Sequence, residues 1–512
     1  EMMEAVRLNP DNAQWHSELG EVYSAQGRHL ESSAEFGRAV ELEPIEAVYH
    51  YRKGGAALAL ARIPEARSEL ETAAELRPDY AEVHNALGEL IMTQGNVPIA
   101  LDAYRRAVEL SPGVALFHHN LGLCLFKLER VDEATVALEK AIELDPGHKG
   151  WPNELGAIYQ NQGKQREALS LYLKAVERDP EAAAYRHRAG VILLQLDRLE
   201  EARNQLRQAV DLRPYRARWR VELGGVLERL GLLDDALEEF RLVADLEPGE
   251  PTGKYRAGVV LRRLERWEEA LELLTGALDL DPEMAVAYHE FGLVLHLQGK
   301  EEEALGAIMQ ALTIEPDNAT FSLSAGQVLK ALRRYDEAAT ELESCLSSCP
   351  DLAEVHVELG SVYELQGRFE ASAMEYSLAY SLDPGSARNQ RILGLALLKM
   401  HRLEAAASCL RRSIEIEPNH AGWHNELGEI LQGQKKNTEA LKAFQRAIEL
   451  EPEVARYQYN LGVAYMRSKR YNDAVGALST AIDLKTDFFA AYWHHAKATL
   501  FSFTTRFLRR AP

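Results

Sequence analysis

Residues 13–46 read AQWHSELGEVYSAQGRHLESSAEFGRAVELEPIE. Trp15, Leu19 and Tyr23 recur at every fourth residue, which places them on one apolar stripe of a helix. A turn signal, a glycine between two polar residues, follows this stripe. A second apolar pattern then runs up to Pro44, where a helix has to end because proline cannot continue a helix interior. The stretch therefore predicts a hairpin of two helices, called helix A and helix B below.

The same pattern recurs every 34 residues without an insertion. A glycine in helix A keeps this step throughout the chain, at Gly20, Gly54, Gly88, Gly122, Gly156, Gly190, Gly224, Gly258, Gly292, Gly326, Gly360, Gly394, Gly428 and Gly462. Proline keeps it from Pro10 to Pro452 and fails once, at Thr486. A small residue in helix B keeps it as well. We therefore predict fourteen tandem repeats over residues 13–486, and they have to stack because no single hairpin can bury its own apolar face.

Several of these residues carry a family resemblance. Leu19-Gly20, Tyr23, Phe36, Ala39 and Pro44 together resemble the tetratricopeptide repeat, and the match runs along nearly the whole chain. The resemblance implies an all-α fold, a right-handed α-solenoid or superhelix of stacked hairpins. One departure is regular, because the tryptophan of the family motif stands one position earlier in this chain, at Trp15, Trp151, Trp219 and Trp423.

A second period is twice as long as the first. Odd repeats carry a large residue at one helix B position, and even repeats carry leucine there, as Phe36 and Leu70 illustrate. The turn between the helices alternates too, because odd repeats from Gly27 to Gly367 have a glycine that even repeats lack. We therefore expect double repeats of 68 residues.

The resemblance also implies where partners bind. In proteins similar to this one, helices A line a concave face that binds extended peptides, and the residue before the Leu-Gly pair points into it. The candidate partner-binding residues at this position are Glu18, Arg52, Asn120, Glu154, Arg188, Glu222, Arg256, Glu290, Glu358, Glu426 and Asn460. Glutamate in odd repeats alternates with arginine or asparagine in most even ones. This pattern predicts either salt bridges between neighbouring helices A or a polar track that grips a peptide backbone.

Histidine also repeats in register on helix A, at His16, His50, His84 and His118. Helices in contact lie about 8–10 Å apart, whereas the ligands of one metal ion lie about 2 Å from it. We therefore expect no metal site, and the sequence leaves a response to pH open.

Composition and motifs exclude other classes of function. The net charge of −21 argues against nucleic-acid binding and against an anionic membrane surface. No phosphate-binding loop, nucleophile elbow or His-Glu-x-x-His motif is present, so we expect no catalytic residue, no cofactor and no enzyme activity. The N-terminus carries no targeting information, and localisation is left open with the cytoplasm favoured.

The two ends depart from the repeat. Residues 1–12 are expected to be the second half of a preceding repeat, and residues 487–512 a degenerate terminal helix with a basic, apolar tail. An incomplete repeat at each end could be completed by another copy of the chain. The candidate residues for such end-to-end contact are Phe501, Phe503, Arg506, Phe507 and Leu508.

These observations lead to one principal hypothesis and two alternatives. The principal hypothesis is a non-catalytic scaffold that binds proteins or extended peptides on its concave face. The first alternative is a structural protein that forms homo-oligomers or head-to-tail filaments through its ends. The second is the substrate-recruiting arm of a larger enzyme whose catalytic part lies elsewhere.

Overall fold

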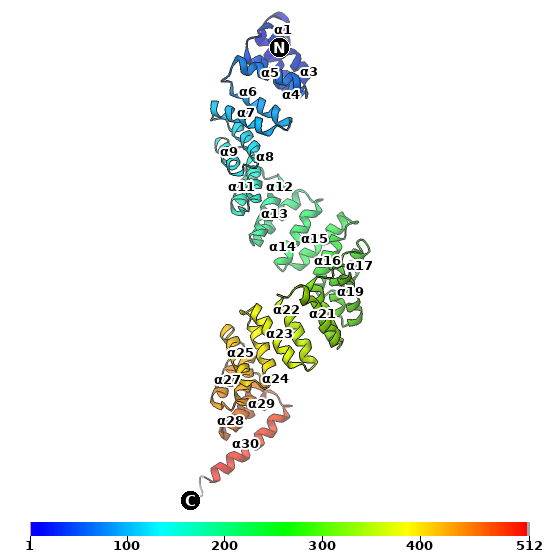
Figure 1. The fold of residues 1–512 in the computed structure, drawn as a ribbon, viewed down its shortest axis with the longest axis vertical. Helices are drawn as coiled ribbons and strands as arrows, with labels where there is room; N and C mark the ends of the chain where they lie inside the picture. Colours follow the sequence, from blue (N-terminus) through cyan, green and yellow to red (C-terminus); the bar gives the residue numbers. More distant parts are fainter. Residues whose placement is uncertain (1, 509–512) are drawn as a thin grey trace. The chain divides into compact units, whose positions relative to one another are not determined.

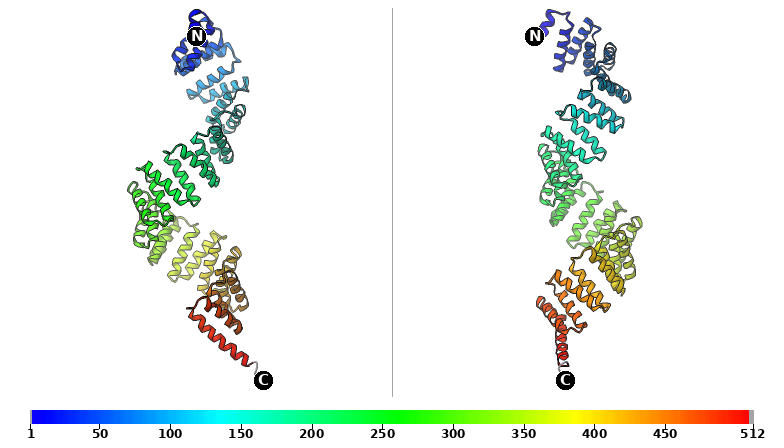
Figure 2. Two further views of the ribbon diagram at one scale, coloured as in Figure 1. Left: turned by 180° about the vertical axis from the view of Figure 1, so that it is seen from behind. Right: turned by 90° about the vertical axis from the view of Figure 1, so that its left-hand side faces the viewer.

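The computed structural model describes the backbone of residues 2–508 and the side chains of residues 2–504. The described residues form helices and no strand. They group into two compact units, residues 1–247 and residues 248–512, which we call the N-terminal unit and the C-terminal unit. In each unit, helices pair into hairpins along the chain (Figures 1 and 2). The division at 12/13 and 486/487 expected from the sequence stays a prediction.

The N-terminal unit holds fifteen of the described helices. They are α1 (Met2–Leu8), α2 (Ala13–Ala25), α3 (His29–Leu42), α4 (Ala47–Ala59), α5 (Ile63–Leu76), α6 (Ala81–Thr93), α7 (Val97–Leu110), α8 (Ala115–Lys127), α9 (Val131–Leu144), α10 (Trp151–Asn161), α11 (Gln165–Arg178), α12 (Ala183–Gln195), α13 (Leu199–Leu212), α14 (Ala217–Arg229) and α15 (Leu233–Leu246).

The C-terminal unit continues with the same alternation of helix A and helix B. Its described helices are α16 (Thr252–Arg263), α17 (Trp267–Leu278), α18 (Ala285–Leu297), α19 (Glu301–Ile314), α20 (Ala319–Ala331), α21 (Tyr335–Ser348), α22 (Ala353–Leu365), α23 (Phe369–Leu382), α24 (Ala387–Lys399), α25 (Leu403–Ile416), α26 (Ala421–Gly433), α27 (Asn437–Leu450), α28 (Ala455–Arg467), α29 (Tyr471–Leu484) and α30 (Phe489–Leu508). Even-numbered helices from α2 to α28 are the helices A.

The first repeat shows why each hairpin begins and ends where it does. The side chain of Asn12 accepts a hydrogen bond of 3.0 Å from the backbone N–H of Trp15, which satisfies one free donor at the start of α2. Helix α3 ends at Leu42, two residues before Pro44. The proline series therefore marks the ends of the helices B, as the sequence predicts.

The glycine series marks the closest approach of helix A to helix B within a hairpin. A Cβ atom on Gly20 would lie 2.6 Å from a ring carbon of Phe36, and one on Gly54 would lie 2.8 Å from Leu70. Both distances are too short for carbon atoms in contact. Only glycine leaves room for the large helix B residue, so the glycine period and the Phe/Leu alternation belong to one packing contact.

The turns of odd and even repeats have the same backbone conformation despite their different residues. The turn glycines of the odd repeats have φ between 73° and 78°. The even repeats place residues such as Ala61 and Glu129 at the same point, with φ of 56° and 59°. In both kinds of repeat the next backbone N–H donates to a helix A carbonyl, as Arg28 does to Tyr23 and Arg62 to Ala57, each at 2.9 Å. The 68-residue period therefore changes side chains and leaves the turn unchanged.

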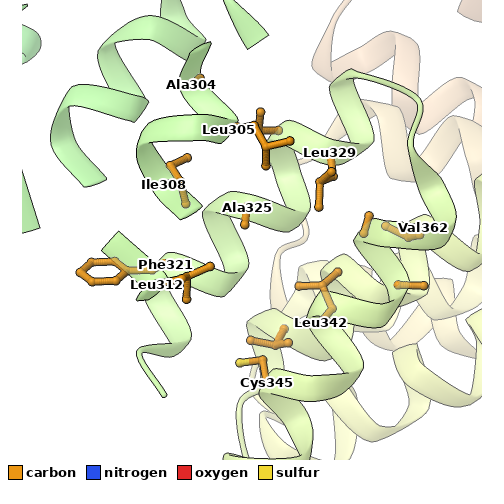
Figure 3. Close-up of a cluster of buried hydrophobic side chains, with 14 of the residues drawn as sticks. Ala304, Leu305, Ile308, Leu312, Phe321, Ala325, Leu329, Leu342, Cys345 and Val362 are labelled. Atoms are coloured by element: carbon orange, nitrogen blue, oxygen red, sulfur yellow. The ribbon is translucent and has the colours of Figure 1, made fainter. Parts of the chain in front are cut away.

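The apolar interior runs between hairpins as well as within them. In the C-terminal unit one cluster of buried side chains joins α19, α20, α21 and α22 (Figure 3). Ile308 and Leu342, the large helix B residues of two successive repeats, are fully buried in it, and Leu329 of the helix between them is 4% exposed. Stacking therefore buries the faces that a single hairpin would leave in water.

Helix α30 takes the place of a further helix A and departs from the pattern. Ala496 stands at the glycine position and is exposed, whereas the equivalent glycines Gly428 and Gly462 are buried. Phe501 packs against Tyr471 of α29 with ring centroids 5.3 Å apart. Phe503 is 74% exposed. The side chains of Arg506, Phe507 and Leu508 lie outside the described residues.

No helix in the described part of the chain combines the length and the apolar character needed to cross a bilayer.

Candidate interaction surface on the helices A

The residues predicted to contact partners all lie on helices A. Each stands two positions before the packing glycine of its repeat. Arg188 and Arg256 are exposed, and the other nine are half-buried. Their side chains are therefore accessible without being fully solvated.

Hydrogen bonds link successive helices A through these residues. Each link joins two residues that are 35 apart in the sequence. The first stands just before the candidate position of one repeat, and the second stands at the candidate position of the next repeat. Asn120 donates 2.9 Å to Asn85, and Arg188 donates 3.0 Å to Asn153. Further links are Ser17–Arg52, His119–Glu154, His187–Glu222, His289–Ser324, Arg391–Glu426, Asn425–Asn460 and Tyr459–His494. We call this series the polar ladder.

The other glutamates of the series take their partners from elsewhere. Glu290 accepts from Arg262 at 2.6 Å, and Glu358 is paired with Lys330. Glu18 accepts from Gln14 of its own helix at 2.8 Å. Each candidate side chain that takes part in one of these contacts is therefore held in a defined orientation inside the array.

The polar ladder includes residues that the sequence did not single out. The residue before each candidate position supplies half of every link, and Asn85, His119 and Arg391 are examples. The signal that could have found them is the spacing of complementary polar residues at 35 instead of 34 residues, such as His119 with Glu154 and His187 with Glu222.

Burial and ion pairing shift the pKa values of two side chains in the polar ladder. Burial lowers the pKa of His289 to about 4, helped by the nearby positive charge of Arg262. The His289 ring nitrogen Nε2 lies 2.8 Å from the hydroxyl of Ser324. The hydrogen bonds from Arg391 to Glu426 raise the pKa of the Arg391 guanidinium. The polar ladder therefore includes a neutral side chain at His289 and a charged one at Arg391.

The ladder is interrupted in the C-terminal unit. Leu323 and Val357 occupy the positions where other repeats carry the polar partner, and the residues 35 positions later are Glu358 and Ile392. Leu323 and Val357 line a cavity of about 360 Å³ between α20, α22 and the start of α24. In the N-terminal unit Val221 also interrupts the ladder, and so does the pair of Tyr51 and Ala86, where the ring of Tyr51 packs 5.3 Å from that of Tyr80.

The repeated histidines have a structural contact in common. His16, His50, His84 and His118 each place Nε2 2.9–3.0 Å from the carbonyl of the proline six residues earlier. His16 and His50 also place Nδ1 2.6 Å from a glutamate of their own helix B. These histidines therefore tie helix A to the turn before it.

The described residues contain no group of three or more histidine, cysteine, aspartate or glutamate side chains arranged to hold a metal ion.

Comparison with known sequences gives the family. The sequence model of the tetratricopeptide repeat matches residues 51–115, 153–217, 187–251, 255–319, 323–387, 393–449 and 431–487, and a second model of the same repeat matches residues 115–148. No curated protein matches the chain significantly.

Several solved structures are similar to the chain. YrrB, a TPR protein with an unusual peptide-binding site, is 28% identical over 37% of this chain and 97% of its own, with a TM-score of 0.34. A tetratricopeptide repeat protein from Parabacteroides merdae is 15% identical over 49% of this chain and 98% of its own, with a TM-score of 0.42. The APC/C hetero-tetramer Cut9-Hcn1 is 13% identical over 90% of this chain and 98% of its own, with a TM-score of 0.39.

The family match confirms the all-α repeat solenoid predicted from the sequence and supports a role as a protein-interaction scaffold. It covers most of the chain. The chain belongs to the tetratricopeptide repeat family.

Proposed function

We propose that successive helices A form a concave surface that binds extended segments of partner proteins. The observation that supports this most is the polar ladder, because it sets half-buried donors and acceptors in fixed orientations along successive helices A. An extended backbone exposes an N–H and a carbonyl at every residue and needs such partners when it leaves water. The candidate residues of the ladder, from Arg52 to Asn460, are the groups we expect to contact it.

A charge-reversal experiment tests this proposal. The variant Glu154→Lys/Arg188→Glu/Glu222→Lys changes three neighbouring candidate positions in the N-terminal unit. The matched control Glu143→Lys/Lys174→Glu/Glu177→Lys makes the same changes of charge at exposed positions of helices B. Partners recovered on the immobilised chain are identified by mass spectrometry, and circular dichroism checks that each variant is folded. We expect the first variant to lose partners that the control retains. Equal recovery by both would show that another surface is used.

Self-association through α30 is a second candidate. Phe489, Trp493, Leu500 and Phe503 are 82%, 60%, 62% and 74% exposed and lie on one face of this helix. A continuous stripe of exposed apolar side chains commonly marks a surface that contacts another protein. Light scattering and negative-stain imaging of the chain and of its variant Trp493→Gln/Leu500→Gln/Phe503→Gln test this candidate. Growth of the particle with concentration, abolished in the variant, would support it. A particle near 57.4 kDa for both would remove it.

A further inference from the structure

The interruption of the polar ladder in the C-terminal unit leaves a hollow on the proposed binding surface. Leu323 and Val357 offer no hydrogen bond to the next helix A, and their short apolar side chains do not fill the space between α20, α22 and α24. The result is the cavity of about 360 Å³ described above. At the interruption at Tyr51, the Tyr51 ring packs against Tyr80. The hollow therefore follows from the size of the residue at this position as well as from its polarity.

The charges around the cavity are mostly negative. Glu354, Glu358 and Asp383 line it together with one cation, Arg388. Glu358 is paired with Lys330. Among the described residues, neither Glu354 nor Asp383 has an ion-pair partner. The cavity thus combines the apolar side chains of Leu323 and Val357 with two carboxylates, Glu354 and Asp383, that take part in no ion pair among the described residues.

We propose that this cavity binds a basic side chain, lysine or arginine, of an extended partner segment. This inference rests on the proposed function of the helices A. The methylene groups of a basic side chain can lie against Leu323 and Val357 while its charged end reaches the carboxylates. An acidic side chain would face three carboxylates, and a short apolar one would leave Glu354 and Asp383 without an ion-pair partner. The chain as a whole, with a net charge of −21, also favours basic partners.

The array itself suggests a variant that closes the cavity without changing charge. The position of Val357 is occupied by tyrosine in three other repeats, at Tyr51, Tyr255 and Tyr459. Val357→Tyr should therefore fold and fill the hollow. Glu354→Gln/Asp383→Asn removes two carboxylates and leaves the shape unchanged. Arg388→Gln removes the cation, and we expect the opposite effect because this cation repels a basic guest.

The experiment uses a phage-displayed library of random nine-residue peptides selected on the full chain. Selected peptides are synthesised with a fluorophore, and their affinities are measured by fluorescence anisotropy. We expect a lysine or arginine at one fixed position in the selected peptides. Its replacement by glutamine, Val357→Tyr and Glu354→Gln/Asp383→Asn should each weaken binding at least tenfold. Arg388→Gln should strengthen binding a few-fold.

The outcomes separate this inference from the proposed function. Two outcomes would overturn the cavity proposal and leave the helix A surface standing. In the first, the selected peptides contain no basic residue. In the second, the peptides bind Val357→Tyr as tightly as the parent chain but bind the Glu154/Arg188/Glu222 variant more weakly. Failure to select any peptide, or selection of peptides that bind all of these variants equally, would overturn both.

Discussion

The guanidinium of Arg220 donates a hydrogen bond of 2.5 Å to the carboxylate of Glu239, which is 2% exposed. Its Nε donates 2.9 Å to the carbonyl of Pro214. In another repeat His356 makes the corresponding two contacts, at 2.6 Å to Glu375 and 2.9 Å to the carbonyl of Pro350. Arginine and histidine thus form the same clamp between helix A, helix B and the preceding turn.

The clamp predicts that His356→Arg is tolerated and His356→Ala is not. Alanine removes both hydrogen bonds and leaves the half-buried Glu375 without its partner, which should cost about 2–3 kcal/mol in the local stability of α22 and α23. Hydrogen exchange followed by mass spectrometry measures this locally, which matters because long repeat arrays can open one hairpin at a time. Equal loss of protection in both variants would mean that the shape of the imidazole, and not the two hydrogen bonds, is what the site requires.

Replacing either of two adjacent glycines of α14 by alanine should have opposite effects on the stability of the hairpin. A Cβ on Gly224 would lie 2.6 Å from the ring of Phe240, whereas one on Gly225 would meet nothing within 4 Å. Gly224→Ala should therefore destabilise the hairpin α14–α15 by about 1–3 kcal/mol through overpacking. Gly225→Ala should stabilise it by about 1 kcal/mol, because alanine is the better helix former.

Hydrogen exchange in α14 and α15 is the measurement for this pair, and each variant is the control for the other. If both substitutions stabilise the hairpin, then Phe240 moves aside at little cost, and the strict glycine period has a cause other than this contact.

The residues of this contact repeat in fixed register in the sequence, although the contact itself was not predicted from it. Gly20 and Phe36 keep the same separation in every odd repeat, so their periods and the missing side chain together point to close packing. The polar ladder was harder to predict. The repeat period relates residues 34 apart, such as Glu18 and Arg52, whereas the links join residues 35 apart, such as Ser17 and Arg52. Which residue of the next repeat a side chain contacts depends on how the two repeats pack against each other. The sequence period of 34 residues does not reveal that the contacts join residues 35 apart.

The turns predict a second matched pair. Gly95 has φ of 78° and Ala61 has φ of 56° at the same point of successive turns. A residue with a Cβ costs about 1–2 kcal/mol in this left-handed conformation. Gly95→Ala should therefore destabilise the hairpin α6–α7, and Ala61→Gly should stabilise α4–α5 by about 1 kcal/mol or less because glycine also loses more freedom on folding. Local hydrogen exchange reports both changes. No gain from Ala61→Gly would show that the even repeats accommodate alanine without strain.

This turn was the feature of the fold that the sequence misrepresented. The absence of glycine at positions such as Ala61 and Glu129 suggests a different turn in even repeats, yet the backbone is the same. The reason is that the hydrogen bond closing the turn and the packing of the two helices outweigh a local preference of about 1–2 kcal/mol. A local propensity is informative only when the tertiary contacts around it are weak.

His289 predicts how stability depends on pH. Burial lowers its pKa in the folded chain to about 4, below the value of about 6.5 for an unfolded histidine. Between these two values the unfolded chain binds a proton that the folded chain does not bind. The stability contributed by neutral His289 is therefore complete above about pH 6.5 and is lost as the pH falls towards about 4.

The variant His289→Asn isolates this contribution from the titration of the carboxylates. Asparagine occurs naturally at the same position in Asn85, Asn153 and Asn425, so the substitution keeps a polar group that can bond to Ser324. Urea unfolding followed by circular dichroism at pH 7 and at pH 4.5 gives the loss of stability for each protein. The parent chain should lose more than the variant over this interval, because only the parent has to keep a buried imidazole neutral. The same loss in both would show that His289 takes up its proton without opening the contact between α18 and α20, and that this rung of the ladder is insensitive to acid.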